Sequence, residues 1–295
     1  MGTPIILDGA YFAKKKFEAV KSKVSKLIAN GEKLPKLAVI LVGDDEASKI
    51  YVSNKEKKAK ECFIETETIF LDKDISKKEL EEVIFKLNLD TNITGILLQL
   101  PLPNGFDKNY FLSLISPNKD VDCLTPINTS KLFNGKPSVY PCTPKAVMEL
   151  ISLSLNGNSH DGLESFEKID LSGKNALVIG RSMLVGLPLS FMLLRQNATV
   201  TISHSRTKDL ALQVKDKDII VSAVGKEKLI NSDNVKDGAI LIDVGINRAS
   251  DNKVVGDIDF ESFKNKDVFI SPVPNGVGPM TIATLMENVV RLNAK

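Results

Sequence analysis

The sequence predicts an α/β protein of two αβα domains around a cleft, each built on a parallel sheet that helices cover on both faces. Short apolar runs without charges, such as residues 37–42 and 176–179, are typical of strands buried on both faces of a parallel sheet. Segments with helical periodicity alternate with these runs, as crossover helices do. At 295 residues and 43% hydrophobic composition, the chain is long enough for two such domains.

The first half of the chain is expected to alternate between helix and strand. Residues 10–30 have a lysine-rich amphipathic pattern, so an apolar stripe should face the protein and the lysines should face solvent. The stripe consists of Phe17, Val20, Val24, Leu27 and Ile28. Ser76 and Glu79 have the spacing of a capping box, which predicts that a helix begins there. The other expected elements are a strand over 37–42, a helix over 47–62, and strands over 65–71 and 94–100.

The second half repeats the alternation after an irregular segment, 116–143, in which proline, glycine, asparagine and aspartate cluster. We expect one domain over 1–143, on which the C-terminal helix over 279–295 packs back, and a second domain over 144–270. Residues 156–168 should form an exposed insertion. The expected elements are helices over 144–155 and 187–196 and strands over 176–179, 198–202, 218–225, 239–245 and 268–272.

The stretch over 174–206 is typical of a strand, a glycine-bounded turn, a helix and a second strand. Such a turn offers free backbone N–H groups and a helix dipole to an anion, so it is a candidate phosphate site. Its glycines, Gly180 and Gly186, do not match the usual G-x-G-x-x-G fingerprint. By itself the turn is therefore compatible with a Rossmann-like dinucleotide-binding domain and with an ordinary crossover.

The residues after the second strand favour NADP over NAD. An NAD site usually has an Asp or Glu there, which binds the ribose 2′-hydroxyl. This chain has no acid between Ile202 and Asp209. Ser205 and Arg206, with Arg181 from the turn, could instead bind a 2′-phosphate, because the planar guanidinium of arginine binds phosphate oxygens bidentately.

Composition excludes several classes of function. A net charge of +2 and the absence of tryptophan argue against a nucleic-acid surface. No apolar run is long enough for a membrane span, and the N-terminus lacks the charge order of a signal peptide. Cys62, Cys123 and Cys142 are an odd number without a close pair, so we expect no disulfide and no metal site, but reduced thiols in the cytoplasm.

Candidate catalytic residues occur in the first half. Tyr51 and Lys55 are four residues apart on one face of an expected helix, where an ammonium and a phenol can tune each other's acidity. The same spacing in a lysine-rich segment is also compatible with a solvated face. Gln99 ends an apolar strand, which indicates either a site or a hydrogen-bonded core amide. Asp120 and Asp122 lie in the irregular segment, where acids usually form turns.

Taken together, the motifs of the chain resemble those of the bifunctional methylenetetrahydrofolate dehydrogenase/methenyltetrahydrofolate cyclohydrolase family. The resemblance extends over nearly the whole chain. It implies a folate-binding catalytic domain, a Rossmann-like NADP-binding domain and a homodimer formed through the NADP domains. The motifs are, in order, SKIYVSNKEK, GILLQLPLP, KDVDCLTP, PCTPKAV, VIGRSMLVGLP, HSRT, IDVGIN and PVPNGVGPMT.

The resemblance also implies the residues of the site. Asp122 would accept hydrogen bonds from the pterin ring of the folate. Tyr51 and Gln99 would position Lys55 and the reacting one-carbon unit. The loop that closes over the folate would include Pro272 and Gly276, and the residues that bind NADP would be Gly180, Arg181, Ser182, Ser205, Arg206, Gly225 and Ile246.

The two reactions implied by the resemblance make different demands. Hydride loss from the methylene carbon is assisted by the adjacent nitrogen lone pair, so positioning suffices. Ring opening by water requires a proton transfer. We expect Lys55 to assist that transfer, with a pKa lowered towards roughly 7–8 by partial burial.

Three features depart from the family pattern, one of which is the insertion over 156–168, which has no counterpart in it. Cys123 stands where the DVD motif is usually followed by glycine, so its side chain could crowd the loop or demand another backbone angle. Asn275 stands in place of a glycine in the PVPGG motif, and the turn should survive because asparagine tolerates positive φ. Two other functions stay open: a different two-domain NADP-dependent dehydrogenase, and a nucleotide-sensing protein without activity. Turnover of 5,10-methylenetetrahydrofolate with NADP distinguishes both from the folate enzyme.

Overall fold

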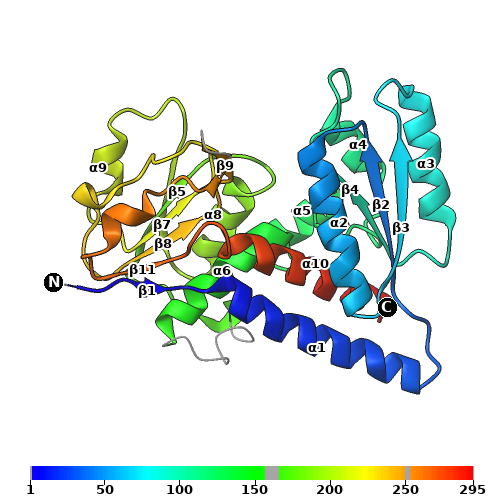
Figure 1. The fold of residues 1–295 in the computed structure, drawn as a ribbon, viewed down its shortest axis with the longest axis horizontal. Helices are drawn as coiled ribbons and strands as arrows, with labels where there is room; N and C mark the ends of the chain where they lie inside the picture. The colour runs from blue at the N-terminus through cyan, green and yellow to red at the C-terminus, as the bar shows by residue number, and fades with distance from the viewer. Residues whose placement is uncertain (1, 157–165, 250–252, 295) are drawn as a thin grey trace. The chain divides into compact units, whose positions relative to one another are not determined.

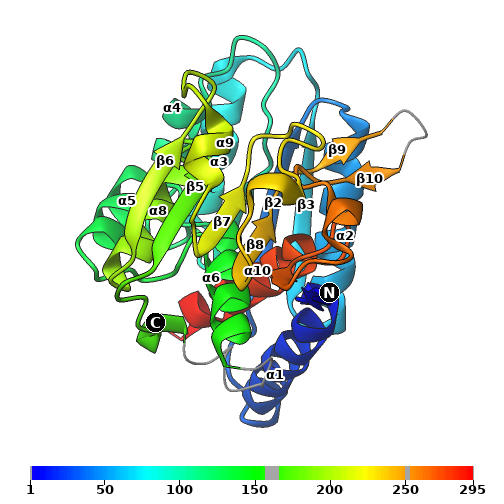
Figure 2. The ribbon, with the colours of Figure 1, turned by 90° about the vertical axis from the view of Figure 1, so that its left-hand side faces the viewer.

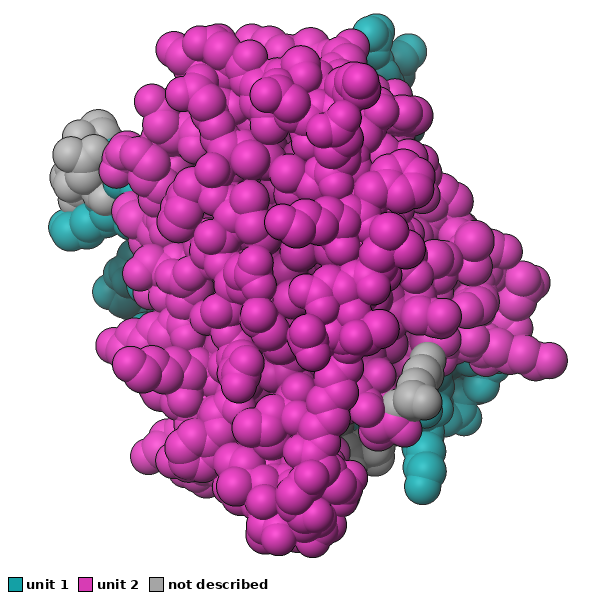
Figure 3. Space-filling view, turned by 90° about the vertical axis from the view of Figure 1, so that its right-hand side faces the viewer, with its two compact units in different colours: residues 1–13, 143–281 teal, residues 14–142, 282–295 magenta. Residues whose placement is uncertain are grey.

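The computed structural model describes residues 2–156, 166–249 and 253–294. The chain divides into two compact units (Figures 1 and 3). Unit 1 comprises Met1–Ala13 and Thr143–Thr281, and unit 2 comprises Lys14–Cys142 and Ile282–Lys295. The expected first domain therefore differs from unit 2 in its N-terminal segment. The insertion expected over 156–168 lies mostly outside the described residues.

Unit 2 is built on a three-stranded parallel sheet in the order β3-β2-β4. β2 (Lys36–Val42) and β3 (Glu65–Leu71) lie where the sequence predicts strands, and β4 (Gly95–Leu98) is shorter than predicted. Successive residues of a strand face opposite sides of the sheet, and nearly every residue of β2 is buried, so both faces of this central strand are covered. One face packs in a core cluster that includes Phe111.

The first two helices after β2 follow the sequence prediction. α2 (Glu46–Glu61) contacts β2 and β3. α3 (Lys77–Leu89) begins at the predicted capping box, which is confirmed. Ser76 Oγ accepts a hydrogen bond from the Glu79 N–H, and the Glu79 carboxylate accepts one from the Ser76 N–H.

The segment predicted to be irregular, 116–143, contains a helix. α5 (Pro126–Phe133) follows the short helix α4 (Lys108–Leu114). Thr125 caps α5 through its side chain, and Pro126 stands at the first helical position, where its fixed φ and missing N–H cost nothing. The prediction of no regular structure was wrong here because the cluster of proline, glycine, asparagine and aspartate indicated only irregular backbone, although a threonine followed by a proline also starts a helix.

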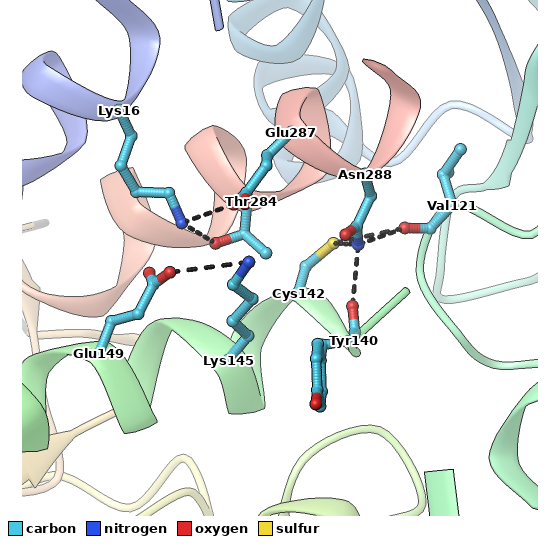
Figure 4. A network of polar contacts seen from close by, with 9 residues as sticks. All are labelled: Lys16, Val121, Tyr140, Cys142, Lys145, Glu149, Thr284, Glu287 and Asn288. Carbon is cyan, nitrogen blue, oxygen red and sulfur yellow. Dashed lines mark hydrogen bonds and ion pairs between the residues drawn. The ribbon is translucent and has the colours of Figure 1, made fainter. Parts of the chain in front are cut away.

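α1 (Gly9–Ala29) is the lysine-rich helix that the sequence predicts, but its buried side differs from the prediction. Ile28 of the predicted apolar stripe is 49% exposed. Lys16, predicted to face solvent, is buried, and its ammonium contacts Thr284 Oγ1 at 3.0 Å and the Glu287 carboxylate at 3.1 Å (Figure 4). The sequence could not show this because both partners lie on the C-terminal helix.

Unit 1 contains a six-stranded parallel sheet in the order β1-β11-β8-β7-β5-β6. Figure 2 labels four of its strands, β8, β7, β5 and β6. The N-terminal strand was not predicted, because two residues carry no periodicity. It pairs with β11, which explains why the N-terminal segment clusters with unit 1 and not with unit 2. The strands are β1 (Ile5–Ile6), β5 (Asn175–Ile179), β6 (Thr199–Ser203), β7 (Ile219–Ser222), β8 (Ala239–Asp243) and β11 (Val268–Ile270).

Helix α8 (Gly186–Arg195) packs against β5 and β6 of this sheet. Among the described residues, no helix of the protein is long and apolar enough to cross a membrane. Helices α6 and α10 are divided between the units. The first residue of α6 (Cys142–Leu155) and the part of α10 (Val277–Asn293) from Ile282 onwards belong to unit 2. The remaining elements are α9 (Leu210–Val214), the antiparallel pair β9 (Asn247–Arg248) and β10 (Val254–Val255), and short 3-10 helices at Phe166–Lys168, Ser232–Asn234 and Phe260–Phe263.

Candidate active site

Helix α2 carries two of the predicted catalytic residues. Asp45 caps its N-terminus by accepting a hydrogen bond from the Ser48 N–H at 2.8 Å. Ser48, Tyr51 and Lys55 follow at intervals of three and four residues, which places them on one side of the helix. Ser48 is buried and Tyr51 and Lys55 are half-buried, whereas Lys57 is exposed. The side with Tyr51 and Lys55 is therefore not a solvated helix face.

Gln99 lies one residue beyond the end of β4 and contacts Lys55. The Lys55 ammonium donates to Gln99 Oε1 at 2.8 Å, and Gln99 Nε2 donates to the Leu100 carbonyl at 2.6 Å. Because Leu100 holds the amide nitrogen, the amide oxygen faces the lysine, which thus has a neutral acceptor as its partner. Gln99 is 9% exposed, so it is a hydrogen-bonded core amide and a neighbour of Lys55 at the same time.

The first aspartate of the DVD motif holds a loop. Ile96 of β4 forms a parallel bridge with Asp120, so this segment runs beside β4. Asp120 is 2% exposed. Its carboxylate accepts hydrogen bonds from the following turn, from the N–H groups of Leu124 and Thr125 and from Nδ2 of Asn128. Asp120 therefore has the turn-forming role that is usual for an acid in a loop.

Asp122, the second aspartate, interacts with Lys55. Its Oδ1 accepts a hydrogen bond from the Cys142 N–H at 3.1 Å. This donor is available because the first N–H groups of a helix have no partner within the helix. The charges of Asp122 and Lys55 also favour each other. The structure thus brings Lys55, Gln99 and Asp122 together in unit 2, with Tyr51 one turn before Lys55 on α2.

Burial dominates the acid–base properties of this cluster. Loss of hydration lowers the pKa of the Lys55 ammonium, and the charge of Asp122 opposes that effect. The predicted direction of the Lys55 shift is confirmed. Loss of hydration raises the pKa of Asp122, against the hydrogen bonds from Cys142 and the charge of Lys55. An amine with a lowered pKa can take a proton from water and return it to a leaving nitrogen.

Cys123 adopts the backbone conformation that glycine favours. Its φ is +57°, and its side chain is 3% exposed. The loop therefore keeps a left-handed residue at this position and accommodates the thiol in the interior. With Cys123 at this position, Asp122 accepts a hydrogen bond from the Cys142 N–H and Asp120 accepts one from the Thr125 N–H.

Two substitutions of Cys123 test this conformation. Cys123→Gly should change the free energy of unfolding by less than about 1 kcal/mol, because relief of the left-handed conformation offsets the lost burial. Cys123→Val should destabilise the protein by about 2 kcal/mol, because a β-branched residue is strained at positive φ. Urea unfolding measures both values. A valine variant as stable as the glycine variant would contradict the left-handed conformation.

In unit 1, the predicted cofactor residues lie after the carboxyl ends of the parallel strands. The chain passes from β5 to β6 on one side and then crosses to β7 on the other, so the strand order reverses beside β5. Ligands of open parallel sheets bind outside the strand ends at such a point. Gly180 follows β5, Ser205 and Arg206 follow β6, Gly225 follows β7, and Ile246 follows β8.

The two glycines of the turn permit close backbone packing. Gly180 has a φ of +123°, and a Cβ on it would lie 2.7 Å from the Ala223 carbonyl oxygen, just beyond β7. A Cβ on Gly186, the first residue of α8, would lie 2.2 Å from the Gly180 carbonyl oxygen. Only glycine lets the helix start so near the strand end. The G-x5-G spacing therefore has the packing role of a dinucleotide fingerprint, although its pattern differs.

The residues predicted to bind phosphate are exposed on the turns after β5 and β6. Ser182 Oγ accepts a hydrogen bond from the Val185 N–H at 3.1 Å, so it stabilises the turn before α8. The Arg206 N–H donates to His204 Nδ1 at 3.1 Å, which closes the second turn. Both turns leave side chains in solvent, those of Arg181, Ser182, Ser205 and Arg206.

Asp257, which the sequence did not single out, connects the loops after β7 and β8. It is fully buried, at 0% exposure. At the end of β7 its carboxylate accepts a hydrogen bond from the Ser222 hydroxyl, and just beyond β7 it accepts two more from the Val224 and Lys226 N–H groups. Beyond β8, it accepts one from Asn247 Nδ2 at 3.1 Å. These loops carry the predicted cofactor residues Gly225 and Ile246.

Asp243 supports the same region from the end of β8. Its carboxylate accepts hydrogen bonds from the N–H groups of Gly245, Asp257 and Ile258. Burial raises the pKa of Asp243 to about 6. An acid at a strand end, as in IDVG, is a visible sequence signal. Asp257 has no such signal in the sequence, because its hydrogen-bond partners lie up to 35 residues away in the chain.

The predicted substrate loop follows β11 in unit 1. A Cβ on Gly276 would lie 2.4 Å from the Pro272 carbonyl oxygen, so the loop folds tightly on itself. Asn275 has a φ of +80°, which confirms that asparagine occupies a left-handed turn position here. Its carbonyl accepts a hydrogen bond from the Ala10 N–H at 2.9 Å.

Comparison with known proteins identifies both parts of the chain. Residues 7–122 match the catalytic domain of the tetrahydrofolate dehydrogenase/cyclohydrolase family, and residues 141–295 match the NAD(P)-binding domain of that family. The bifunctional protein FolD of Campylobacter hominis is 46% identical over 286 residues, which cover 97% of this chain and 96% of that protein.

Solved structures agree with this match. The crystal structure of the bifunctional enzyme FolD, methylenetetrahydrofolate dehydrogenase/cyclohydrolase, from Campylobacter jejuni is similar with a TM-score of 0.91 and 43% identity over 99% of each chain. The Trypanosoma brucei methylenetetrahydrofolate dehydrogenase-cyclohydrolase, complexed with NADP and an inhibitor, has a TM-score of 0.90 and 34% identity over 100% of this chain and 98% of that chain. The chain therefore belongs to the tetrahydrofolate dehydrogenase/cyclohydrolase family.

Proposed function

We propose that this protein oxidises 5,10-methylenetetrahydrofolate to 5,10-methenyltetrahydrofolate with NADP and then hydrolyses the product to 10-formyltetrahydrofolate. The observation that carries the proposal is the cluster of Lys55, Gln99 and Asp122, in which burial lowers the pKa of the lysine. The reaction class comes from the family. The relatives from C. jejuni and T. brucei are described as enzymes with this pair of activities, which supports the same assignment.

The oxidation requires positioning rather than a protein base. The methylene carbon loses a hydride to the nicotinamide ring of NADP, and the lone pair of the adjacent nitrogen stabilises the cation that forms. Asp122 is assigned to the N–H groups of the pterin ring. Burial raises the pKa of Asp122, and the Cys142 N–H and the charge of Lys55 oppose that effect by stabilising the ionised form that accepts such hydrogen bonds. Tyr51 and Gln99 are assigned to hold Lys55 beside the reacting carbon.

The hydrolysis requires proton transfer. Water adds to the cationic methenyl carbon and loses a proton, after which one C–N bond breaks and the leaving nitrogen gains a proton. We assign both transfers to Lys55, which accepts the proton as a neutral amine and returns it as an ammonium. An ordinary lysine would be protonated at neutral pH, so the lowered pKa is what makes this role available.

The dinucleotide is assigned to unit 1. The turn from Gly180 to Gly186 is assigned to a phosphate at the N-terminus of α8, and Gly225 and Ile246, which follow β7 and β8, are assigned to the rest of the dinucleotide. The 2′-phosphate is assigned to Ser205 and Arg206 with Arg181, since no acid lies between Ile202 and Asp209 to bind a ribose hydroxyl, and Ser182 is assigned to the NADP phosphates in general. Pro272 and Gly276 are assigned to the loop over the folate.

Asp257→Asn tests the cofactor loops. The new amide nitrogen would face N–H and O–H donors, so at least one buried donor loses its acceptor, at a cost of about 1–3 kcal/mol. We expect the Kd of NADP to rise by roughly tenfold, while the KM of the folate changes little. Calorimetric titration with NADP measures the effect. Unchanged affinity in a folded variant would show that these loops do not bind the cofactor.

A spectrophotometric assay tests the proposed function as a whole. The enzyme is supplied with 5,10-methylenetetrahydrofolate and either NADP or NAD, and the methenyl product is followed as it forms and decays. We expect formation to be faster with NADP and decay to exceed the uncatalysed rate. Tight NADP binding without turnover of the folate would favour a sensing protein, and turnover of a hydroxy acid in place of the folate would favour a different dehydrogenase.

We also propose that the protein forms a homodimer through its NADP domains and that it is located in the cytoplasm. The proposal of a dimer rests on the family resemblance and on two features of unit 1. β6 lies at the edge of the six-stranded sheet, and Ile202 on this strand is 38% exposed. Sedimentation equilibrium should give twice the mass of one chain. A monomer at micromolar concentration would contradict the dimer.

A further inference from the structure

We propose that Asn288, on the C-terminal helix α10, is a positioning residue that holds Asp122 in place for substrate binding; this inference rests on the function proposed above. Asn288 is 1% exposed. Its side-chain amide points at two other segments of unit 2 (Figure 4). Nδ2 donates to the carbonyl oxygens of Val121 and Tyr140, each at 2.8 Å.

These two carbonyls flank both partners of the Asp122 hydrogen bond. Val121 directly precedes Asp122, and Tyr140 lies two residues before Cys142, whose N–H donates to Asp122 Oδ1 at 3.1 Å. An amide nitrogen carries two hydrogens, and Asn288 directs them at the two segments. The Cys142 thiol lies against the same atoms, 3.5 Å from Asn288 Nδ2 and 3.7 Å from the Val121 carbonyl. One buried amide therefore sets the separation between the segments that hold the carboxylate.

Other residues hold the nearby turn and anchor helix α10, so these structural roles do not fall to Asn288. Asp120 already holds the turn that follows the DVD motif, so that turn does not depend on Asn288. Thr284, one turn earlier on α10, and Glu287, directly before Asn288, contact the buried ammonium of Lys16, which anchors the helix that carries Asn288. The contribution left to Asn288 is the placement of Asp122 relative to Cys142.

Asn288→Asp replaces the donor nitrogen by an acceptor oxygen that faces two carbonyls. We expect the KM of the methylene-folate substrate to rise by about tenfold, with the KM of NADP unchanged. Asn288→Ser, which keeps one neutral donor, should give a smaller rise in the folate KM. It replaces Asn288→Asp in the experiment if the aspartate variant does not fold. Asn293→Asp is the matched control, because Asn293 lies on the same helix and donates to the Lys33 carbonyl at 2.8 Å. It should leave both KM values unchanged.

A double-mutant cycle shows whether Asn288 acts through Asp122. Asn288→Ser should raise the folate KM in the wild-type background and should not raise it further in Asp122→Ala. An equal rise in both backgrounds, or an equal rise in the KM of NADP, would overturn the assignment. If the wild-type enzyme turns over no folate, the proposed function itself has failed. If it does and Asn288→Asp behaves as wild type, only this inference has failed.

Discussion

Lys55→Met is expected to abolish the cyclohydrolase activity while much of the dehydrogenase activity remains. Methionine has a similar length but cannot take a proton from water, and a lost general base typically costs a factor of about 10²–10⁴. Hydride transfer needs no protein base, so its rate should stay within about tenfold of the wild-type rate. Formation and decay of the methenyl compound, followed separately, measure the two activities.

Lys57→Met is the control for this experiment. Lys57 lies on the same helix and is exposed, so its loss should alter neither activity. If Lys55→Met reduced both activities to the same extent, Lys55 would be a binding residue and the assigned proton transfer would be wrong.

The pH dependence of stability separates loss of chemistry from loss of fold. Burial lowers the pKa of Lys55 in the folded protein. At a pH between this folded pKa and the ordinary lysine value near 10.4, the Lys55 side chain is neutral in the folded protein and protonated in the unfolded chain. Lys55 therefore destabilises the folded protein by the largest amount when the pH is below its folded pKa. This destabilisation disappears as the pH rises through the ordinary lysine pKa. Lys55→Met should unfold at higher urea than the wild type at neutral pH, and the difference should shrink towards pH 11.

Gly186→Ala is expected to weaken NADP binding by at least about tenfold, because a clash of this kind costs on the order of 1–3 kcal/mol or more. A Cβ at this position would lie 2.2 Å from the Gly180 carbonyl oxygen, a backbone atom that has no flexible side chain by which to move aside. The start of α8 must therefore move away from the end of β5. That movement displaces the N–H groups assigned to the phosphate. Titration with NADP measures the change in Kd.

Gly173→Ala separates this effect from general destabilisation. Gly173 precedes β5, at the opposite end of the strand from Gly180, with a φ of +75° and open space around its Cβ position. Alanine there should cost about 1 kcal/mol of stability through its positive φ, without changing the affinity for NADP. Equal weakening of NADP binding in the two variants would contradict a specific role for Gly186.

Local signals in the sequence were sufficient for most elements and for the candidate cluster. The capping box at Ser76 was recognisable because capping depends on residues three apart. Lys55 and Gln99 were found from a helix spacing and a strand end. Their contact needed only the general rule that the ends of parallel strands gather at one edge.

Residues whose partners are remote in the chain were the ones that the sequence could not reveal. Lys16 was predicted to be solvated because its neighbours are lysines, yet it contacts Thr284. Asp257 and Asn288 act through loops that precede them by dozens of residues, and a single polar residue carries no periodicity from which burial could be inferred. Such contacts depend on the tertiary arrangement of each unit, which composition and spacing do not encode.

The most direct test of this account is the titration of Lys55 itself. The ε-carbon resonances of isotope-labelled lysine can be followed by NMR, and the Lys55 signal is the one absent from the Lys55→Met variant. We predict that Lys55 titrates clearly below the ordinary lysine value of about 10.4, at the same pH as the acid limb of the cyclohydrolase rate. A Lys55 that titrates at or above the ordinary value, in an enzyme that hydrolyses the methenyl compound at neutral pH, would contradict its role in proton transfer.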